Sequence, residues 1–146
     1  MSAIAIVGSG LVGRAWAISF ARGGHEVRLY DETPGAAAAA QKFAGEALPM
    51  LEAEGLLDDQ GAATVAARLS LAPSLEAALD GAVHVQESTP ENVDVKKGVF
   101  SRLDALAGPD TVEYTVQGQR SDSAGAVSDI LVINFGRQGP GVAGAG

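Results

Sequence analysis

The stretch that decides the fold is residues 4–13, which read IAIVGSGLVG. Its first four residues belong to the apolar run 3–7, which predicts a strand, and three glycines follow in the spacing G-x-G-x-x-G, at Gly8, Gly10 and Gly13. In a strand–turn–helix unit the first glycine allows a tight turn, the second lets a pyrophosphate approach the backbone, and the third lets the helix lie close to the sheet. The pattern predicts a phosphate-binding turn between a buried strand and a helix whose N-terminal N–H groups face the phosphates.

The sequence after this turn favours a dinucleotide site. An amphipathic run at 11–22 predicts the helix, and the apolar run 26–30 predicts a second strand that stops at Asp31. Asp31 falls 18 residues after Gly13, close to where an acid accepts hydrogen bonds from the adenosine ribose. A purely structural turn is the alternative, because the glycine spacing alone is a weak signal in a chain with 19 glycines. Agreement between strand, helix and acid favours the dinucleotide interpretation.

Composition limits the classes of function. The chain has 146 residues, enough for one domain with its own core. Its net charge of −8 and pI near 4.6 argue against binding nucleic acid or an anionic membrane through a basic face. The absence of cysteine excludes a disulfide framework and a thiolate metal site, and we expect no metal. With neither a signal-peptide pattern nor an apolar run of membrane-spanning length, the expected location is the cytoplasm.

Strand and helix signals continue to alternate along the chain. A helix is predicted at about 34–54, with Thr33 as its cap, Pro34 at its first position, and Pro49 as a point where it kinks or splits. A second helix is predicted from Leu57 to about residue 67, so that the two form a hairpin. The further expected elements are strands at 69–71, 82–86, 111–116 and 129–135, and helices at 74–79, capped by Ser74, and 91–106.

This alternation predicts an α/β fold, a Rossmann-type doubly wound parallel sheet with a helical hairpin inserted after the second strand. We expect residues 1–112 to form the dinucleotide-binding domain. Residues 113–139, where Gly, Ser and Gln become frequent, are expected to be a divergent continuation with room for one further strand. The Gly- and Ala-rich residues 140–146 are expected to be a disordered tail.

Two motifs together resemble a known family. They are GSGLVGRAWA at 8–17, with Asp31 after it, and ESTPENVDVKKGVFSRLD at 87–104. These residues resemble the NAD-binding domain of L-3-hydroxyacyl-CoA dehydrogenases, and G-R-x-W-A is most similar to the lambda-crystallin and L-gulonate 3-dehydrogenase branch. The resemblance covers about residues 3–112, and the second motif is far more specific than the glycine spacing.

The resemblance implies an NAD site and assigns its residues. It places the pyrophosphate at the turn made by Gly8, Ser9, Gly10, Leu11, Val12 and Gly13. It gives the adenosine ribose to Asp31 and the nicotinamide half of the cofactor to Glu91 and Lys96. From the residues alone, Glu91 follows a strand's carboxyl end, where open α/β sheets bind ligands. The alternative is an acid favoured by the helix dipole, followed by a solvated lysine.

NAD is favoured over NADP by the residues around Asp31. This carboxylate would repel a 2′-phosphate, and the next residue is Glu32 rather than an arginine that could bind one. Arg28 lies earlier on the strand, and we expect it to point toward a sheet face.

The resemblance fails where the family places its catalytic base. A histidine within G-x-H-F-x-N-P is implied beyond the fifth strand, yet His84 is the last histidine here. His25 and His84 are interpreted as structural, so no catalytic residue is assigned, and the family's helical domain is also not recognisable. The abrupt change near residue 113 suggests a C-terminal part that was replaced, truncated or read in another frame.

Two functions remain open. The resemblance implies an oxidoreductase of fatty acid metabolism that transfers hydride between NAD and a 3-hydroxy acid or its CoA ester. The alternative is a module that binds NAD without turnover. The expected partners are NAD and a small hydroxy acid or acyl-CoA, with no nucleic acid and no membrane, and a homodimer is left open.

Overall fold

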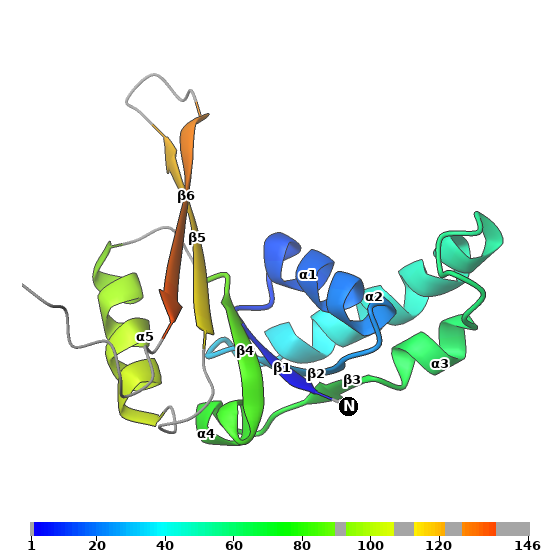
Figure 1. Ribbon diagram of the computed structural model, residues 1–146, viewed down its shortest axis with the longest axis horizontal. Coiled ribbons are helices and arrows are strands. Elements are labelled where there is room, and N and C mark those ends of the chain that lie inside the picture. Colours follow the sequence, from blue (N-terminus) through cyan, green and yellow to red (C-terminus); the bar gives the residue numbers. More distant parts are fainter. Residues whose placement is uncertain (1, 90–92, 107–112, 122–126, 137–146) are drawn as a thin grey trace, which may run out of the picture.

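The computed structural model describes residues 2–89, 93–106, 113–121 and 127–136 (Figure 1). Strands and helices alternate along most of this part of the chain. The strands are β1 (Ala3–Val7), β2 (Glu26–Tyr30), β3 (Leu69–Leu71), β4 (Ala82–Glu87), β5 (Glu113–Ser121) and β6 (Val127–Gly136). The helices are α1 (Leu11–Arg22), α2 (Ala36–Ala53), α3 (Ala62–Ala66), α4 (Leu75–Leu79) and α5 (Val93–Leu106).

The strands form a sheet in the order β3-β2-β1-β4-β5-β6. β1 pairs in parallel with β2 on one side and with β4 on the other, and the pairs β2–β3 and β4–β5 are also parallel. The chain therefore builds the sheet outward from β1 in one direction and then crosses back to build it in the other. This topology confirms the predicted α/β, Rossmann-type doubly wound sheet, and it places a ligand crevice at the carboxyl ends of β1 and β4.

β6 departs from the parallel pattern. It runs antiparallel to β5 and forms one edge of the sheet, as one strand of a long hairpin. The sequence predicts strands at 111–116 and 129–135, and the structure places them at 113–121 and 127–136. Residues 111–112 and the proposed tail at 140–146 lie outside the described residues. The division of the chain at residue 112 stays a prediction.

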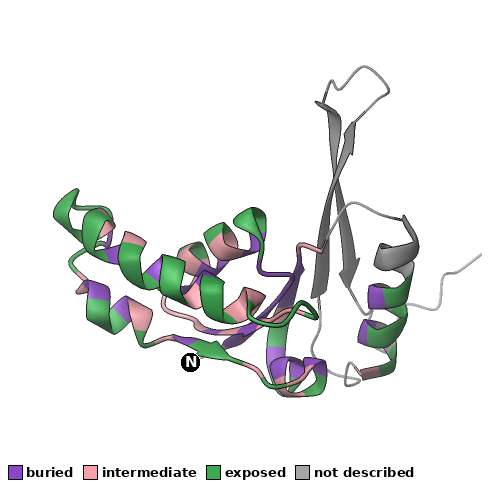
Figure 2. Ribbon diagram, turned by 180° about the vertical axis from the view of Figure 1, so that it is seen from behind, coloured by how far each residue is buried: buried purple, intermediate pink, exposed green. Residues whose placement is uncertain are grey.

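Both faces of the sheet are covered, which explains why β1 is apolar throughout. All five of its residues are buried. Ile4 and Ile6 belong to a core shared with α1, α2 and α3, whereas Ala5 and Val7 belong to a second core shared with α4 and α5. In Figure 2 the central strands are buried and the outer faces of the helices are exposed. Alternate side chains of one strand therefore support two helical layers.

The start of α2 differs from the sequence prediction. The helix begins at Ala36 after Gly35, which has φ 81° and no side chain with which to cap. The prediction of Thr33 as the cap, with Pro34 at the first helical position, is wrong. The Thr33 N–H instead donates to the Asp31 carboxylate, so this loop is organised around the acid. Pro49 lies within α2, which is not split there.

The second helix of the hairpin also begins later than predicted. Residues 54–59 form turns, and α3 starts only at Ala62. Asp58 and Asp59 have φ values of 50° and 64°, in the left-handed region that a right-handed helix cannot include. The hairpin itself is present, because buried residues of α2 and α3 share one core with Leu57.

The remaining elements agree closely with the sequence. β1, α1, β2 and β3 have the predicted bounds, and β4 is one residue longer than predicted. The Ser74 hydroxyl accepts a hydrogen bond of 3.1 Å from the Ala77 N–H, which confirms it as the cap of α4. None of the helices in the described part of the chain has the length and hydropathy needed to cross a bilayer.

Candidate functional site

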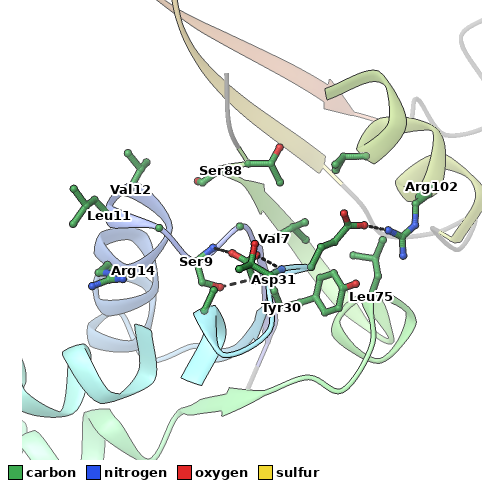
Figure 3. A pocket seen from close by; sticks show the side chains of 17 residues that line it. Val7, Ser9, Leu11, Val12, Arg14, Tyr30, Asp31, Leu75, Ser88 and Arg102 are labelled. Atoms are coloured by element: carbon green, nitrogen blue, oxygen red, sulfur yellow. Dashed lines mark hydrogen bonds and ion pairs between the residues drawn. The ribbon is translucent and has the colours of Figure 1, made fainter. Parts of the chain in front are cut away.

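A cleft of about 610 Å³ lies at the carboxyl edge of the sheet, where β1 and β4 diverge (Figure 3). Its floor is the turn after β1, at residues 8–12, and one wall is the end of β2, at residues 30–32. Ser88 and Thr89 after β4, together with side chains of α4 and α5, line the opposite side. The volume is in the range of small-molecule sites, and the position is that of ligands in doubly wound sheets.

The three glycines of the turn have different structural reasons. Gly8 has φ 96°, and a Cβ there would lie 2.6 Å from the Ser88 carbonyl carbon. A Cβ on Gly13 would lie 1.9 Å from the Gly8 carbonyl oxygen. By contrast, no described atom lies within 4 Å of a Cβ built on Gly10. Gly8 and Gly13 are therefore required by the protein's own backbone, whereas Gly10 leaves space that the protein does not use.

The N-terminus of α1 opens into this space. Its N-cap is Gly10, and the first hydrogen bond of the helix runs from the Arg14 N–H to the Gly10 carbonyl at 2.9 Å. The N–H groups of residues 11–13 precede that bond and have no carbonyl within the helix. The first turn contains no acidic side chain that could use them. These donors and the positive end of the helix dipole suit an anionic group such as a pyrophosphate.

Asp31, directly after β2, places its carboxylate beside the turn that precedes this helix, and backbone donors hold the carboxylate in place. Oδ2 accepts a 2.7 Å hydrogen bond from the Ser9 N–H, and Oδ1 accepts one of 2.8 Å from the Thr33 N–H. The Ser9 hydroxyl donates to the Tyr30 carbonyl at 3.3 Å and so ties the turn to the end of β2. A carboxylate has about four acceptor sites, so each oxygen can accept a further hydroxyl.

Arg14 is a cleft residue that sequence analysis did not single out. Its guanidinium carbon lies 5.0 Å from the centre of the Phe43 ring on α2, a cation–π arrangement. The Nε atom is buried, and among the described atoms it has no hydrogen-bond partner. Its place directly after the third glycine, one turn from the helix start, was the available sequence signal.

Arg102 is a second cleft residue that the sequence did not reveal. It extends from α5 and forms an ion pair with Glu32 at the end of β2 (Figure 3). Both side chains are partly exposed, at 48% for Arg102 and 63% for Glu32. A hydrogen bond that the Arg102 guanidinium donates to the Tyr30 hydroxyl oxygen is the main cause that raises the pKa of Arg102, and the Glu32 charge adds to it. The pair joins residues 70 positions apart, which local sequence patterns cannot detect.

The structure brings the predicted turn residues and Asp31 together in the cleft. Gly13 packs directly beneath it, against Gly8. Glu91 lies outside the described residues. Lys96 falls within α5, but its side chain is not among those described, so both assignments to the nicotinamide half stay predictions.

Neither histidine is among the described residues that line the cleft. His25 Nδ1 lies 2.6 Å from the Ser2 hydroxyl, and the His84 ring packs 5.5 Å from that of Phe20. Both contacts favour structural roles. Arg28 also lies elsewhere, since it pairs with Glu26 and donates to carbonyls at the end of α4.

The strand order, the glycine turn and the acid at the end of β2 define a dinucleotide-binding domain of the Rossmann class. More specifically, this chain belongs to the family described as 3-hydroxyacyl-CoA dehydrogenase, NAD binding domain, whose sequence pattern matches residues 3–117. The resemblance inferred from the two motifs is confirmed, and NAD is the cofactor of this domain class.

Individual proteins with similar sequences support this family assignment. Lambda-crystallin of Oryctolagus cuniculus is 42% identical over 106 residues, which cover 70% of this chain and 33% of the relative. L-carnitine dehydrogenase of Streptomyces griseus is 38% identical over 109 residues, or 75% of this chain and 31% of that enzyme. This chain thus spans about a third of the length of these curated relatives.

The fold is also shared with a solved dehydrogenase. The crystal structure of 3-hydroxybutyryl-CoA dehydrogenase from Escherichia coli superposes with a TM-score of 0.70 at 24% identity. The match covers 85% of this chain and 30% of that one. At this identity the likeness supports the fold, while the relatives in sequence support the family.

Proposed function

We propose that this chain is the NAD-binding part of a 3-hydroxyacyl-CoA dehydrogenase-like oxidoreductase. The reaction would transfer hydride between NAD and a 3-hydroxy acid or its CoA ester. The observation that carries the proposal is the open face of Gly10 at the start of α1, with the Asp31 carboxylate in the same cleft. The family match supports the cofactor, and the relatives support the reaction class.

The residues of the turn would have separate tasks in holding the cofactor. The N–H groups of Leu11, Val12 and Gly13 would bind the pyrophosphate, because they are the donors that α1 leaves unused. Asp31 would accept hydrogen bonds from the adenosine ribose. Ser9 would act by positioning Asp31, since its N–H is already donated to that carboxylate. Bound NAD supplies the hydride acceptor, and the protein orients it.

Glu91 and Lys96 are proposed for the nicotinamide half of the site. Their support is the family motif and the place of residue 91 in the sequence, four residues after the last residue of β4. A test is Lys96→Met, which should weaken NAD binding without lowering thermal stability. Equal affinity of the two proteins would remove Lys96 from the site.

An NAD-binding module without turnover is the second candidate. The described residues that line the cleft include no histidine to accept the proton from a substrate hydroxyl. The two candidates agree on the cofactor and differ on chemistry. Consumption of NADH with acetoacetyl-CoA, measured for this chain against a no-enzyme background, separates them. Turnover above background favours the enzyme, and binding without turnover favours the module.

The cofactor proposal itself is tested by calorimetric titration with NAD. A single binding event is expected for the unsubstituted chain, and Gly10→Val should abolish it by filling the free space above the turn. A folded Gly10→Val protein that binds NAD normally would overturn the assignment of the turn.

The substrate, pathway, oligomeric state and location are further parts of the proposal. A 3-hydroxy acid substrate is supported by the family description and by a relative named for L-carnitine, itself a 3-hydroxy acid. A role in fatty acid metabolism rests on the same family description. A homodimer is suggested by exposed apolar side chains away from the cleft, such as Met50 and Leu56, 70% and 46% exposed, and sedimentation would test it. A cytoplasmic location is consistent with the cysteine-free composition, and fractionation of cells would test it.

A further inference from the structure

The Glu32–Arg102 ion pair borders the part of the cleft that Asp31 would use for the ribose. Glu32 directly follows Asp31, and Arg102 of α5 reaches across from the opposite side of the cleft to pair with it. Figure 3 shows Arg102 on one side of Asp31 and Arg14 on the other. Of the described residues that line the cleft, these two arginines are the cations, and Arg14 is engaged with the Phe43 ring. Arg102 is therefore the cation on the Glu32 side of Asp31.

NAD and NADP differ at this place by a phosphate on the ribose. A phosphate monoester carries a charge of about −1.5 to −2 at pH 7 and offers strong acceptor oxygens. Arginine is well suited to bind such a group, because its donors match phosphate geometry. In this structure the Arg102 guanidinium is already paired with the Glu32 carboxylate. A 2′-phosphate would thus meet two carboxylates and an arginine whose charge is compensated.

We propose that Glu32 selects NAD over NADP by holding Arg102, so that this arginine cannot bind a 2′-phosphate. The inference rests on the proposed NAD site and goes beyond it, because it assigns cofactor selectivity to a contact between β2 and α5. Both side chains are partly exposed, so the pair can separate without unpacking the core. When the Glu32 charge is removed, Arg102 still lines the cleft, and its guanidinium is then free to bind a 2′-phosphate.

The expected effect follows from the bond that Arg102 would gain. Hydrogen bonds to charged groups contribute more free energy than most hydrogen bonds in proteins. Because Arg102 is partly exposed, we expect its bond to the phosphate to contribute near the lower limit for such bonds, which is about tenfold in affinity. Glu32→Gln keeps the size of the side chain and removes the charge. The ratio of the dissociation constants for NADP and NAD should fall by about tenfold in this variant.

Calorimetric titrations with NAD and NADP test the inference on the 146-residue chain. Four proteins are compared: the unsubstituted chain, Glu32→Gln, Arg102→Gln and the double variant. The double variant should return the preference for NAD, because the arginine that binds the phosphate is gone. Arg102→Gln alone should not move the preference toward NADP. This cycle separates release of Arg102 from simple removal of repulsion by Glu32.

Glu26→Gln is the matched control. It makes the same chemical change on the same strand and breaks another partly exposed ion pair, with Arg28, whose residues do not line the cleft. The ratio of the two dissociation constants should be unaffected by it.

The outcomes are distinct. An unchanged preference in Glu32→Gln, including an NADP affinity that stays below detection, overturns the inference. A shift that persists in the double variant also overturns it, because repulsion alone then explains the selectivity. If the unsubstituted chain binds neither dinucleotide, the proposed NAD site fails and this inference fails with it. If NAD binds normally and either of the first two results is found, the inference about selectivity is wrong and the proposed NAD site stands.

Discussion

Asp31→Ala is expected to weaken NAD binding by about 10- to 150-fold. The proposed ribose contact is a hydrogen bond to a charged acceptor, which contributes about 1.5–3 kcal/mol in proteins. At about 1.4 kcal/mol for each tenfold change in affinity, this range converts to the stated loss. The estimate assumes that the rest of the site is unchanged by the substitution.

The structure shows where that assumption needs a control. The Asp31 carboxylate also accepts hydrogen bonds from the Ser9 and Thr33 N–H groups, at 2.7 Å and 2.8 Å. Removing it leaves two backbone donors to water at the cleft edge, and the free energy of unfolding should fall by about 1–2 kcal/mol. Asp31→Asn should lie between the other two proteins in both affinity and stability. An amide has one oxygen and an NH2 group, so it can accept from only one of the two backbone donors.

Calorimetry with NAD and thermal unfolding measured on the same samples check the prediction. Glu46→Ala removes an exposed carboxylate on α2 that does not line the cleft, and it should change neither quantity. The expected order of affinity is unsubstituted chain, then Asn, then Ala. An Ala variant that is folded and binds NAD with unchanged affinity refutes the ribose role of Asp31.

Four other substitutions probe the site and its support. Gly10→Val should fold, with a loss of at most about 1 kcal/mol from the poorer N-cap, yet bind no NAD, whereas Gly13→Val should fail to fold because its Cβ would overlap a backbone carbonyl. Circular dichroism melting compares the two. Ser74→Ala should lower stability by about 1 kcal/mol through loss of the α4 cap, and an unchanged Tm would contradict this. Phe43→Leu removes the ring beneath Arg14 and should reduce stability by about 0.5–1 kcal/mol, measured by urea unfolding.

The elements that the sequence predicted well are those with local causes. The apolar run at 3–7 and the glycines after it specify β1, the turn and α1, because burial on both faces and backbone conformation depend on adjacent residues. The Ser74 cap was predictable for the same reason, since its hydroxyl bonds a residue three positions later.

The errors occur where a tertiary contact or an unusual backbone conformation decides. Thr33 resembled a helix cap in sequence, but the helix starts after Gly35, whose φ of 81° lies in the left-handed region. Asp58 and Asp59 resembled the start of a helix, but both adopt positive φ. Aspartate tolerates the left-handed region better than most residues, so the two aspartates were compatible with a helix start and with a turn of positive φ.

The candidate site divides in the same way. Its floor could be predicted, because the turn and Asp31 are set by spacing within one strand–helix–strand unit. Its far wall could not, because Arg102 reaches Glu32 from a helix 70 residues later. From the sequence, Glu32 was noted only because an arginine at this position could bind a 2′-phosphate. The structure shows that Glu32 forms an ion pair with an arginine, Arg102.

The hydrogen bonds of Asp31 also explain how the cleft can be ready for a ligand before one binds. The Ser9 N–H fixes the carboxylate from the turn after β1, and the Thr33 N–H fixes it from the loop before α2. One side chain thereby joins the proposed pyrophosphate and ribose parts of the site across two loops. Loops held in this way would lose little conformational entropy when a ligand binds. The acid proposed to recognise the ribose is thus also the residue that holds together the two loops of the proposed site.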